Sequence, residues 1–501
     1  MGKIRSTQFV LGLALAIAAI GCDQPGSGQL GQSGEVAEVT ASLTTVPSGV
    51  LCVKLALSGS VSSSLMLTVA SGASSASVSL GYLPAGSLTV TPSAFNVACS
   101  SVSSSTVPTW TGPAVTVTVV AGTPLSVPLT LEPYSATATV NFVPFVKSVA
   151  VGYDHSYALL SDGTVRSWGA NFYNQLGDGT GAQRLTPVAV SGLSGVASLA
   201  SGGFAEHACA VKTNGSVYCW GYNADGELGN GGNSNSSVPV AVSGAYLFGQ
   251  VSTGAYYTCG VTTSGAVSCW GDNSYGQFGN GTASPSVTPT TPLNALSGAV
   301  REVQGGSSFT CVRGGTEQVK CAGDNSAGQL GTGNGSSSIS WIASSLQTQT
   351  ALPAGLAVGD LHACAIVLAD GSVRCVGNNY SGQLGDGTSN NNRPTAVPVI
   401  GLTGVTALTA GSSFTCAVKS DGTVWCWGDN PWGQLGSGTF LPQSTPAQVY
   451  GLTGVVSIAA GWMHVCAAKS DGSAWCWGGN SWGQLGDGTT ASEARPVKVV
   501  F

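Results

Sequence analysis

Short runs of apolar and β-branched residues, separated by Gly, Pro and Ser, follow one another through the first part of the chain. Between residues 38 and 145 these runs occupy positions 50–59, 65–72, 77–83, 86–95, 114–122, 124–133 and 136–143. Residues of this kind favour strands, and the intervening residues favour turns. Seven short strands at this spacing predict a small β-sandwich domain.

The rest of the chain repeats one pattern seven times. Each copy contains the string Trp-Gly-x-Asn-x-x-Gly-Gln-Leu-Gly or a close variant of it, and successive copies start 50 to 54 residues apart. The copies start at residues 168, 220, 270, 322, 376, 427 and 477. A period near 50 in a β-rich chain is typical of propeller blades with about four strands each. The sequence therefore predicts an all-β protein in which residues 146–501 form a seven-bladed propeller.

One Asn and the final Gly of the string are present in every copy. The Asn residues are Asn171, Asn223, Asn273, Asn325, Asn379, Asn430 and Asn480. An Asn side chain can bond the backbone of its own turn, and a Gly admits positive φ. We therefore expect one turn geometry, used seven times.

These repeats resemble the regulator of chromosome condensation (RCC1) repeat family, whose members are seven-bladed propellers. The resemblance covers residues 146–501 and extends beyond the string, as in the last copy, VYGLTGVVSIAAGWMHVCAAKSDGSAWCWGGNSWGQLGDGT. In architecture the chain is similar to the secreted β-lactamase-inhibitory protein II, which grips an enzyme with aromatic loops of one face. The domain at residues 38–145 resembles prealbumin-like or Ig-like modules of bacterial surface proteins, which implies a spacer.

Two expectations about the ring follow from the ends of the repeats and from the fourth copy. The first copy begins abruptly at Phe145, whereas the chain ends in a strand-like segment, residues 494–501. We expect this last strand to complete the first blade and to close the ring. The fourth copy has Ala322 in place of Trp and an irregular Arg-Gly-Gly-Thr-Glu-Gln hairpin. Blade 4 is therefore expected to be the least regular.

Charged residues make up only 8% of the 501 residues, and the net charge is −6. The 16 Lys and Arg residues form no basic run. A nucleic-acid partner needs a cluster of cations to neutralise phosphates, so the composition argues against one.

The N-terminus carries the features of an exported lipoprotein. Lys3 and Arg5 precede an apolar stretch from Phe9 to Ile20, which is too short to span a bilayer as a helix. Residues 1–21 are therefore predicted to be a signal peptide. The junction Ala-Ile-Gly-Cys resembles the bacterial lipobox, which implies lipidation of Cys22. The alternative is ordinary secretion with an incidental Cys. Residues 22–37 read as a Gly- and Ser-rich tether, and no later segment reads as a membrane span.

The fifteen cysteines divide without remainder into Cys22 and seven pairs. The first copy lacks both members of its pair, as expected for bonded partners, and the three-residue loop Thr-Asn-Gly sets Cys209 directly opposite Cys219 across two strands. Metal binding would need three or four converging ligands, and the spacing is not a zinc signature. The predicted disulfides, which imply an oxidising compartment, are Cys52–Cys99, Cys209–Cys219, Cys259–Cys269, Cys311–Cys321, Cys364–Cys375, Cys416–Cys426 and Cys466–Cys476.

No catalytic, metal or cofactor site is expected. The four His residues, His155, His207, His362 and His464, all occupy one repeat position, where other copies have Tyr or Phe. A position that accepts Phe is a packing position first, with a metal ring or proton transfer as the alternative. The Gly-x-Ser-x-Gly string at 479–483 lies inside the repeat's own turn, not before a helix, so it is not read as a nucleophile elbow.

The aromatic residues that vary between copies are predicted to gather on one face of the propeller. Adjacent strands are antiparallel, so the loop before each His position and the loop after each Trp-Gly lie at the same edge. The opposite edge carries polar hairpins. Tyr and Trp on rigid loops are common in binding hot spots, with packing between blades as the alternative. The predicted binding residues are Tyr173, Tyr222, Tyr275, Tyr380, Trp432, Trp462 and Trp482.

The sequence favours a non-catalytic binding module of the bacterial cell envelope that recognises a protein or a glycan through this face. The nuclear exchange factor that founded the family works in a different compartment from an exported, disulfide-rich chain. The alternatives are a propeller enzyme, a lyase or hydrolase, and a structural adhesion component. An enzyme would need acids or His residues converging at the pore, and the repeats offer only the four scattered His residues.

Overall fold

A computed structural model of the protein describes residues 36–43, 45–70, 73–120, 123–133, 144–200, 202–291, 293, 295–296, 298–314, 319–347, 355–367 and 370–501. The chain divides into two compact units, Met1–Phe142 and Val143–Phe501. The predicted signal peptide, the lipidation site Cys22 and the expected strand at 136–143 lie outside the described residues. No helix among the described residues is long and apolar enough to cross a membrane.

The N-terminal unit contains two sheets. One has the strand order β4-β1-β8, and the other has the order β3-β2-β5-β6-β9, with β7 paired to β5. The elements are β1 (Val36–Leu43), β2 (Cys52–Gly59), β3 (Ser63–Thr68), β4 (Ala76–Pro84), β5 (Gly86–Phe95), the 3-10 helix η1 (Cys99–Ser101), β6 (Trp110–Thr111), β7 (Val115–Val119), β8 (Leu125–Leu129) and β9 (Glu132–Pro133). A disulfide joins Cys52 of β2 to Cys99 of η1.

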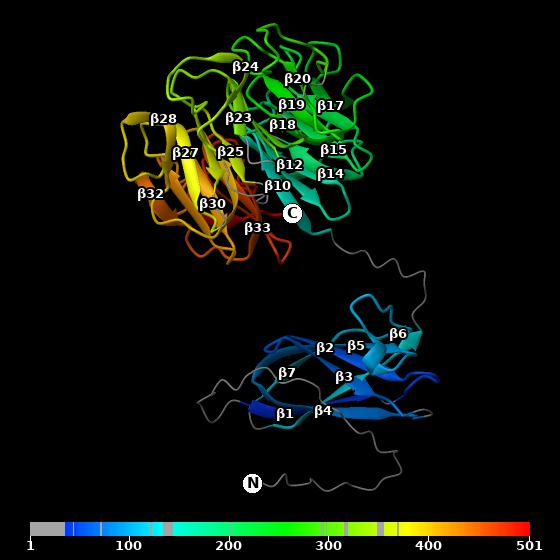
Figure 1. Ribbon diagram of the computed structural model, residues 1–501. Helices are drawn as coiled ribbons and strands as arrows, with labels where there is room; N and C mark the ends of the chain where they lie inside the picture. The colour runs from blue at the N-terminus through cyan, green and yellow to red at the C-terminus, as the bar shows by residue number, and fades with distance from the viewer. Residues whose placement is uncertain are drawn as a thin grey trace. The chain divides into compact units, whose positions relative to one another are not determined.

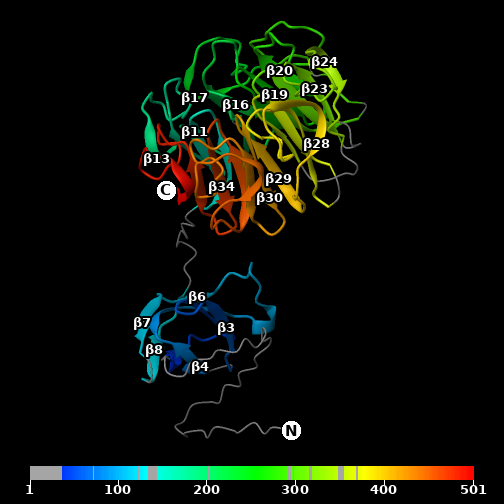
Figure 2. The ribbon, with the colours of Figure 1, turned by 90° about the vertical axis from the view of Figure 1, so that its left-hand side faces the viewer.

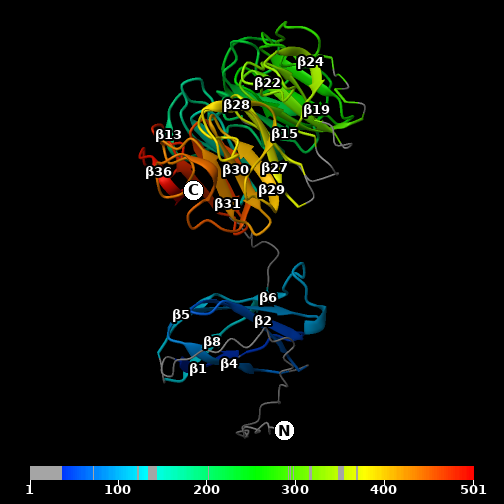
Figure 3. The same cartoon turned by 60° about the vertical axis from the view of Figure 1, so that its left-hand side comes forward.

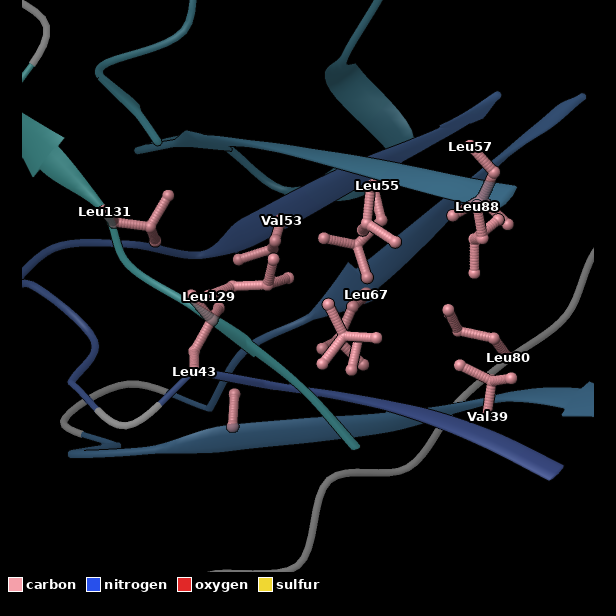
Figure 4. Close-up of a cluster of buried hydrophobic side chains, with 14 of the residues drawn as sticks. Val39, Leu43, Val53, Leu55, Leu57, Leu67, Leu80, Leu88, Leu129 and Leu131 are labelled. Carbon is pink, nitrogen blue, oxygen red and sulfur yellow. The ribbon is translucent and has the colours of Figure 1, made fainter. Parts of the chain in front are cut away.

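Both sheets contribute to one hydrophobic core. Val39 and Leu43 of β1 point toward Leu55 of β2 and Leu88 of β5 (Figure 4). Strand β1 was not predicted, and the expected tether, residues 22–37, extends too far. Alternate side chains of β1 are buried from Ala37 onward. Val and Ala separated by Glu and Thr suffice for a strand because β1 pairs with β4 on one side and with β8 on the other.

The C-terminal unit contains seven sheets, one for each sequence copy. Successive sheets follow one another around a ring, from cyan through green and yellow to red (Figures 1 and 3). The first four sheets contain β10 (Val146–Val151), β11 (His155–Leu160), β12 (Val165–Gly169) and β13 (Arg184–Ala189); β14 (Val196–Ala200), β15 (His207–Lys212), β16 (Val217–Gly221) and β17 (Ser236–Ala241); β18 (Phe248–Thr253), β19 (Tyr257–Thr262) and β20 (Val267–Gly271); and β21 (Val300–Gly305), β22 (Phe309–Gly314), β23 (Val319–Gly323) and β24 (Ser338–Ala343).

The last three sheets contain β25 (Leu356–Val358), β26 (His362–Ile366), β27 (Val373–Asn379) and β28 (Asn391–Pro398); β29 (Val405–Ala410), β30 (Phe414–Lys419), β31 (Val424–Gly428) and β32 (Gln443–Gln448); and β33 (Val455–Ala460), β34 (His464–Lys469), β35 (Ala474–Gly478) and β36 (Glu493–Lys498). The first strand of each sheet lines a central channel of about 290 Å³. The described residues of this lining are small or uncharged.

In blades two to seven the second and third strands form the hairpin that carries the predicted disulfide. In the second blade Cys209 lies directly opposite Cys219, and their Cα atoms are 4.1 Å apart. The other five propeller pairs are bonded in the same way, with Cα separations of 4.0 to 4.1 Å. Each bond stays within one blade, so the disulfides stabilise hairpins and do not link neighbouring blades.

The expectation that the last strand completes the first blade is wrong. Strand β36 pairs with β35 of its own sheet, and the first blade takes all four strands from residues 146–189. The last sheet lies beside the first (Figure 2), and β10 packs against β33 and β34. The ring therefore closes by side-chain packing, through the kind of contact that joins the other blades.

The least regular sheet is the third, not the fourth as predicted. It has three strands, and only isolated bridges at Ser286 and Leu293 stand where other blades have a fourth strand. Pro285 and Pro289 lie in this segment, but the sixth copy has Pro442 and Pro446 at the same two repeat positions and still forms β32, so these prolines do not explain the missing strand. The fourth sheet has four strands, whereas the central part of its unusual hairpin, residues 315–318, lies outside the described residues.

The repeated Trp residues hold neighbouring blades together. Trp477 is fully buried, and its Nε1–H donates to the carbonyl of Gln434 in the preceding blade at 3.0 Å. The same bond, from 2.8 to 2.9 Å, is made by Trp168, Trp220, Trp270 and Trp427. Trp168 reaches Gln484, so this contact also closes the ring.

Candidate functional site

Each copy has a hydrogen-bonded turn after the third strand of its blade, at one edge of the propeller. In the sixth copy the Asn430 side chain accepts from the backbone of Leu435 and donates to the carbonyls of Thr439 and Leu441. The side chain of Gln434 accepts from the backbone N–H of Trp432 at 3.0 Å. The Asn bonds recur in the other copies, which confirms that one turn geometry is repeated.

The structure divides the seven predicted binding residues into two groups. Tyr173, Tyr222 and Trp462 line a pocket of about 360 Å³, together with Tyr153, Phe204 and Tyr256. The other four do not line this pocket, and their side chains are 37 to 59% exposed: Tyr275, Tyr380, Trp432 and Trp482. We name the cavity and all the residues that line it the aromatic pocket. We name the second group the outer aromatics.

Aromatic side chains contact one another around the pocket. Tyr153 stacks on Trp462 with ring centroids 4.3 Å apart, so the first and last blades meet here. Tyr173 packs edge-on against Tyr222 at 5.1 Å, and Tyr222 in turn lies 6.1 Å from Tyr256. Residues from six blades therefore share one cavity, which no single repeat could form.

Two carboxylates, Glu206 and Asp360, also line the aromatic pocket, and the sequence interpretation missed them. Burial, together with nearby Asp154, raises the pKa of Glu206 to about 8, and burial alone raises the pKa of Asp154 to about 6. Burial also raises the pKa of Asp360. The available signal was the repeat position one or two residues before the His, where acids occur in copies 1, 2 and 5.

The hydrogen-bond partners of these carboxylates are neutral. Gln175 donates to Glu206 at 2.6 Å, and Gln484 donates to Asp154 at 3.0 Å. His155 Nδ1 lies 3.8 Å from Glu206, but burial and the neighbouring His residues lower the pKa of His155 to about 3, so its ring is uncharged at pH 7. No Lys or Arg among the described residues forms an ion pair with Asp154, Glu206 or Asp360.

The His residues join blades. His464 Nε2 lies 2.9 Å from the hydroxyl of Ser156 in the first blade, and Ser156 donates to the carbonyl of Gln484 at 2.8 Å. His207 with Thr258 and His362 with Thr415 repeat this arrangement. Burial lowers the pKa of each of these rings to about 3 or 4. Among the described residues no cluster of His, Cys, Asp or Glu could hold a metal ion.

Glu227 stands where the other six copies have Gln. One of its oxygens accepts from the backbone of Asp225 at 3.0 Å, while Oε1 is buried and has no hydrogen-bond partner among the described residues. Burial raises the pKa of Glu227 from its usual 4.5 to about 7. A buried carboxylate in this position destabilises the fold when it ionises.

We expect Glu227→Gln to stabilise the protein in a pH-dependent way. Below about pH 4.5 the carboxyl is protonated in both the folded and the unfolded state, so the gain is small. Between pH 4.5 and 7 the unfolded state ionises first, and the folded wild type loses stability. The gain in unfolding free energy should therefore reach roughly 1–2 kcal/mol at pH 8. Denaturant titrations at pH 5 and pH 8 measure it.

The reverse substitution, Gln434→Glu in the sixth copy, is the matched control. It places a carboxylate on the same backbone N–H, that of Trp432. It should lower stability more at pH 8 than at pH 5. Equal unfolding free energies of Glu227→Gln and wild type at pH 8 would contradict the prediction, because the Glu227 carboxylate would then not destabilise the fold.

Two models of the regulator of chromosome condensation (RCC1) repeat match the chain. One covers residues 162–211, 214–261, 264–313, 370–418, 421–468 and 471–501. The other covers residues 146–175, 196–227, 250–277, 354–383, 405–434 and 455–484. Neither model covers the string of the fourth copy, in which Ala322 replaces Trp.

The chain is 29% identical over 309 residues to the ultraviolet-B receptor UVR8 of Arabidopsis thaliana, a match that spans 60% of the chain and 69% of the receptor. It is 33% identical over 99 residues to the human E3 ubiquitin-protein ligase HERC2, which spans 19% of the chain and 2% of that protein. Mouse RCC1 domain-containing protein 1 is 36% identical over 85 residues, 17% of the chain and 22% of that protein. The chain thus spans only a small part of the last two relatives.

Solved structures of similar fold include human WBSCR16 and yeast RCC1 (Prp20) bound to Kap60. Human WBSCR16 superimposes with a TM-score of 0.60 at 23% identity, over 68% of the chain and 94% of that protein. Yeast Prp20 superimposes with a TM-score of 0.60 at 18% identity, over 72% of the chain and 84% of that protein. These likenesses establish the propeller fold.

Proposed function

Because this chain belongs to the RCC1 repeat family, we propose that it is a non-catalytic binding module that recognises a protein through the edge carrying the aromatic pocket and the outer aromatics. The observation that carries this proposal is the exposure of large aromatic side chains on turns that are otherwise fixed by hydrogen bonds. Yeast RCC1 was solved bound to Kap60, which supports a protein as the class of partner.

The contrast between repeated and variable aromatics supports a role in binding. Trp427 and Trp477 recur at one repeat position and are fully buried, whereas Trp432 and Trp482 occupy a variable position and are exposed. The backbone N–H groups of Trp432 and Trp482 are bonded to Gln434 and Gln484. A fixed loop loses little conformational freedom when it binds, so more of the contact energy goes into affinity.

The hydrogen bonds of the buried His residues support a non-catalytic role. His207, His362 and His464 bond to hydroxyls between blades, and their rings stay neutral at pH 7. The alternative lyase or hydrolase would need a general acid or base in contact with a substrate. These rings lie buried inside blade interfaces.

We also propose that the protein is exported and anchored to the bacterial envelope through a lipid on Cys22. The seven disulfides support an oxidising compartment. We expect Cys22→Ser to release the protein from membranes or to leave it unprocessed, as measured by detergent partitioning and N-terminal sequencing. A mature N-terminus other than residue 22 would contradict this part of the proposal.

Trp432→Ala and Trp482→Ala test the proposed binding edge. Loss of an aromatic anchor costs at least about 2 kcal/mol of binding, roughly thirtyfold in affinity. Loss of an exposed side chain changes stability by only about 0.5 kcal/mol. Both variants should therefore keep the melting temperature of the wild type and lose envelope proteins that the immobilised wild-type chain captures.

Lys419→Ala on the hairpin edge is the control and should retain the captured proteins. Proteins bound equally by wild type, Trp432→Ala and Trp482→Ala would place the binding surface elsewhere. A glycan array with the same variants decides whether a sugar, and not a protein, occupies this edge.

A further inference from the structure

The aromatic pocket combines π faces with buried acidic side chains. Its wall contains Tyr153, Trp462, Tyr222 and Tyr256, and Glu206 and Asp360 are the acidic side chains in its lining. The volume of about 360 Å³ lies at the lower end of the range for ligand pockets. The pocket is therefore built for one small group or one side chain, not for a flat surface.

The acids in and beside the pocket form no ion pair with a Lys or Arg among the described residues. Asp154 raises the cost of ionising Glu206, and the partners of these two carboxyl groups are the amides of Gln484 and Gln175. A positive charge placed beside these groups would offset the cost of burying them. Charge complementarity thus selects a cation.

The aromatic residues select the kind of cation. An organic cation gains from contact with the face of a Trp or Tyr ring, most of all where water is displaced. A metal ion prefers a cluster of oxygen, nitrogen or sulfur ligands, and the described residues contain no such cluster. A lysine side chain ends in four non-hydrogen atoms beyond Cβ, which need roughly 120 Å³ if each takes the volume of a water molecule. It therefore fits the cavity.

Glu227, which does not line the pocket, adds a second observation beside it. In the first and last copies the equivalent Gln donates to an acid one residue before the next His, Glu206 or Asp154. In the third copy Tyr256 occupies the position of that acid. In the second copy Tyr222 directly follows the Trp-Gly. In the first copy this repeat position contacts the pocket residue Glu206, and in the second copy Glu227, with its unpartnered oxygen, acts electrostatically on the pocket residue Tyr222.

We propose that the aromatic pocket binds the cationic side chain of a lysine or arginine presented by a polypeptide partner. This inference rests on the proposed function, since it names the group by which a protein partner engages the binding edge. The alkyl stem of the side chain packs against Tyr153 and Trp462 at the wall, and the charged end faces Glu206 and Asp360. The outer aromatics then contact the surface around the inserted side chain.

The test uses the full chain and three probes, which are tetralysine, tetralysine acetylated on every side chain, and choline. Titration calorimetry and tryptophan fluorescence measure the dissociation constants. We expect tetralysine to bind and its acetylated form, which lacks the charge, to bind at least tenfold more weakly. Glu206→Gln and Trp462→Ala should each weaken tetralysine binding roughly tenfold. Glu206→Gln keeps the shape of the side chain, so it remains informative if Trp462→Ala fails to fold.

Two control variants remove the same chemistry from the opposite edge. Asp421→Asn removes a hairpin carboxylate that bonds Thr423, and Tyr246→Ala removes an exposed ring beside the Thr263 hairpin. Both should keep the dissociation constant of tetralysine within about twofold, since Debye screening limits the reach of a distant charge. Equal binding of tetralysine to wild type and Glu206→Gln would overturn the proposal. Choline binding as tight as tetralysine would overturn the assignment to a polypeptide.

Different experiments test the proposed cation site and the proposed function. If tetralysine binds the pocket variants as tightly as the wild type, but Trp432→Ala still loses captured proteins, the proposed cation site is wrong and the proposed binding edge stands. If the pocket variants weaken tetralysine binding but Trp432→Ala loses no protein, the cation site stands and the wider binding edge is wrong.

Discussion

Replacing Trp477 by alanine is expected to lower the unfolding free energy by about 3–5 kcal/mol, the cost of deleting a large buried aromatic side chain. Trp477 is fully buried in a cluster with Leu435 and Val449 of the preceding blade. The substitution also leaves the carbonyl of Gln434 without the Nε1–H donor 3.0 Å away. Chemical denaturation followed by circular dichroism measures the loss.

Trp482→Ala, five residues later in the same copy, is the matched control. Its ring is exposed and touches Phe172 at a centroid distance of 4.7 Å. We expect it to change the unfolding free energy by no more than about 0.5 kcal/mol. If Trp482→Ala destabilised the protein as much as Trp477→Ala, both rings would be packing residues, and Trp482 would leave the proposed binding edge.

Gly461→Ala is expected to destabilise the protein by about 3 kcal/mol, at the upper end of the usual cost of overpacking. A Cβ at this position would lie 2.6 Å from the carbonyl oxygen of Gly152 and 2.5 Å from Cε1 of His464. Gly152 belongs to the first blade, so the added methyl group forces apart the interface where the ring closes. Thermal unfolding of the variant against wild type measures the effect.

Gly249→Ala is the control for the added methyl group. Gly249 lies in β18, and the nearest atom to a Cβ built there is 4.0 Å away. Alanine also restricts the unfolded chain more than glycine does, so this variant should match or slightly exceed wild-type stability. A melting temperature of Gly461→Ala equal to that of Gly249→Ala would mean that the blades adjust to the methyl group at no cost.

Local features of the repeat were predictable because each depends on residues close together in the chain. The turn fixed by Asn430 bonds only to atoms within eleven positions of it. Cys416 lies opposite Cys426 because a three-residue loop sets the register of one hairpin. The burial of Trp477 followed from its recurrence, since a position with the same demand in most copies is a packing position.

The ends of the chain misled the prediction because closure is a property of the whole ring. The final segment resembles the strand that begins a repeat, but β36 pairs with β35 of its own sheet. The first blade has four strands without it. The loss of Trp at Ala322 looked disruptive, yet the fourth sheet keeps four strands. The missing fourth strand of the third sheet has no comparable local signal, because the sixth copy has prolines at the same repeat positions as Pro285 and Pro289 and still forms β32.

The sequence by itself determined the seven blades, the hairpin disulfides and the edge on which variable aromatics lie, because periodicity and loop length act over one repeat of about 50 residues. Only the tertiary structure decided that Tyr153 stacks on Trp462, that Glu206 and Asp360 share a cavity with them, and that the outer aromatics stand apart. These residues come from copies up to 309 positions apart, from Tyr153 to Trp462, and they meet because the ring brings its ends together. Burial then raises the pKa values of the acids, and no local pattern encodes that environment.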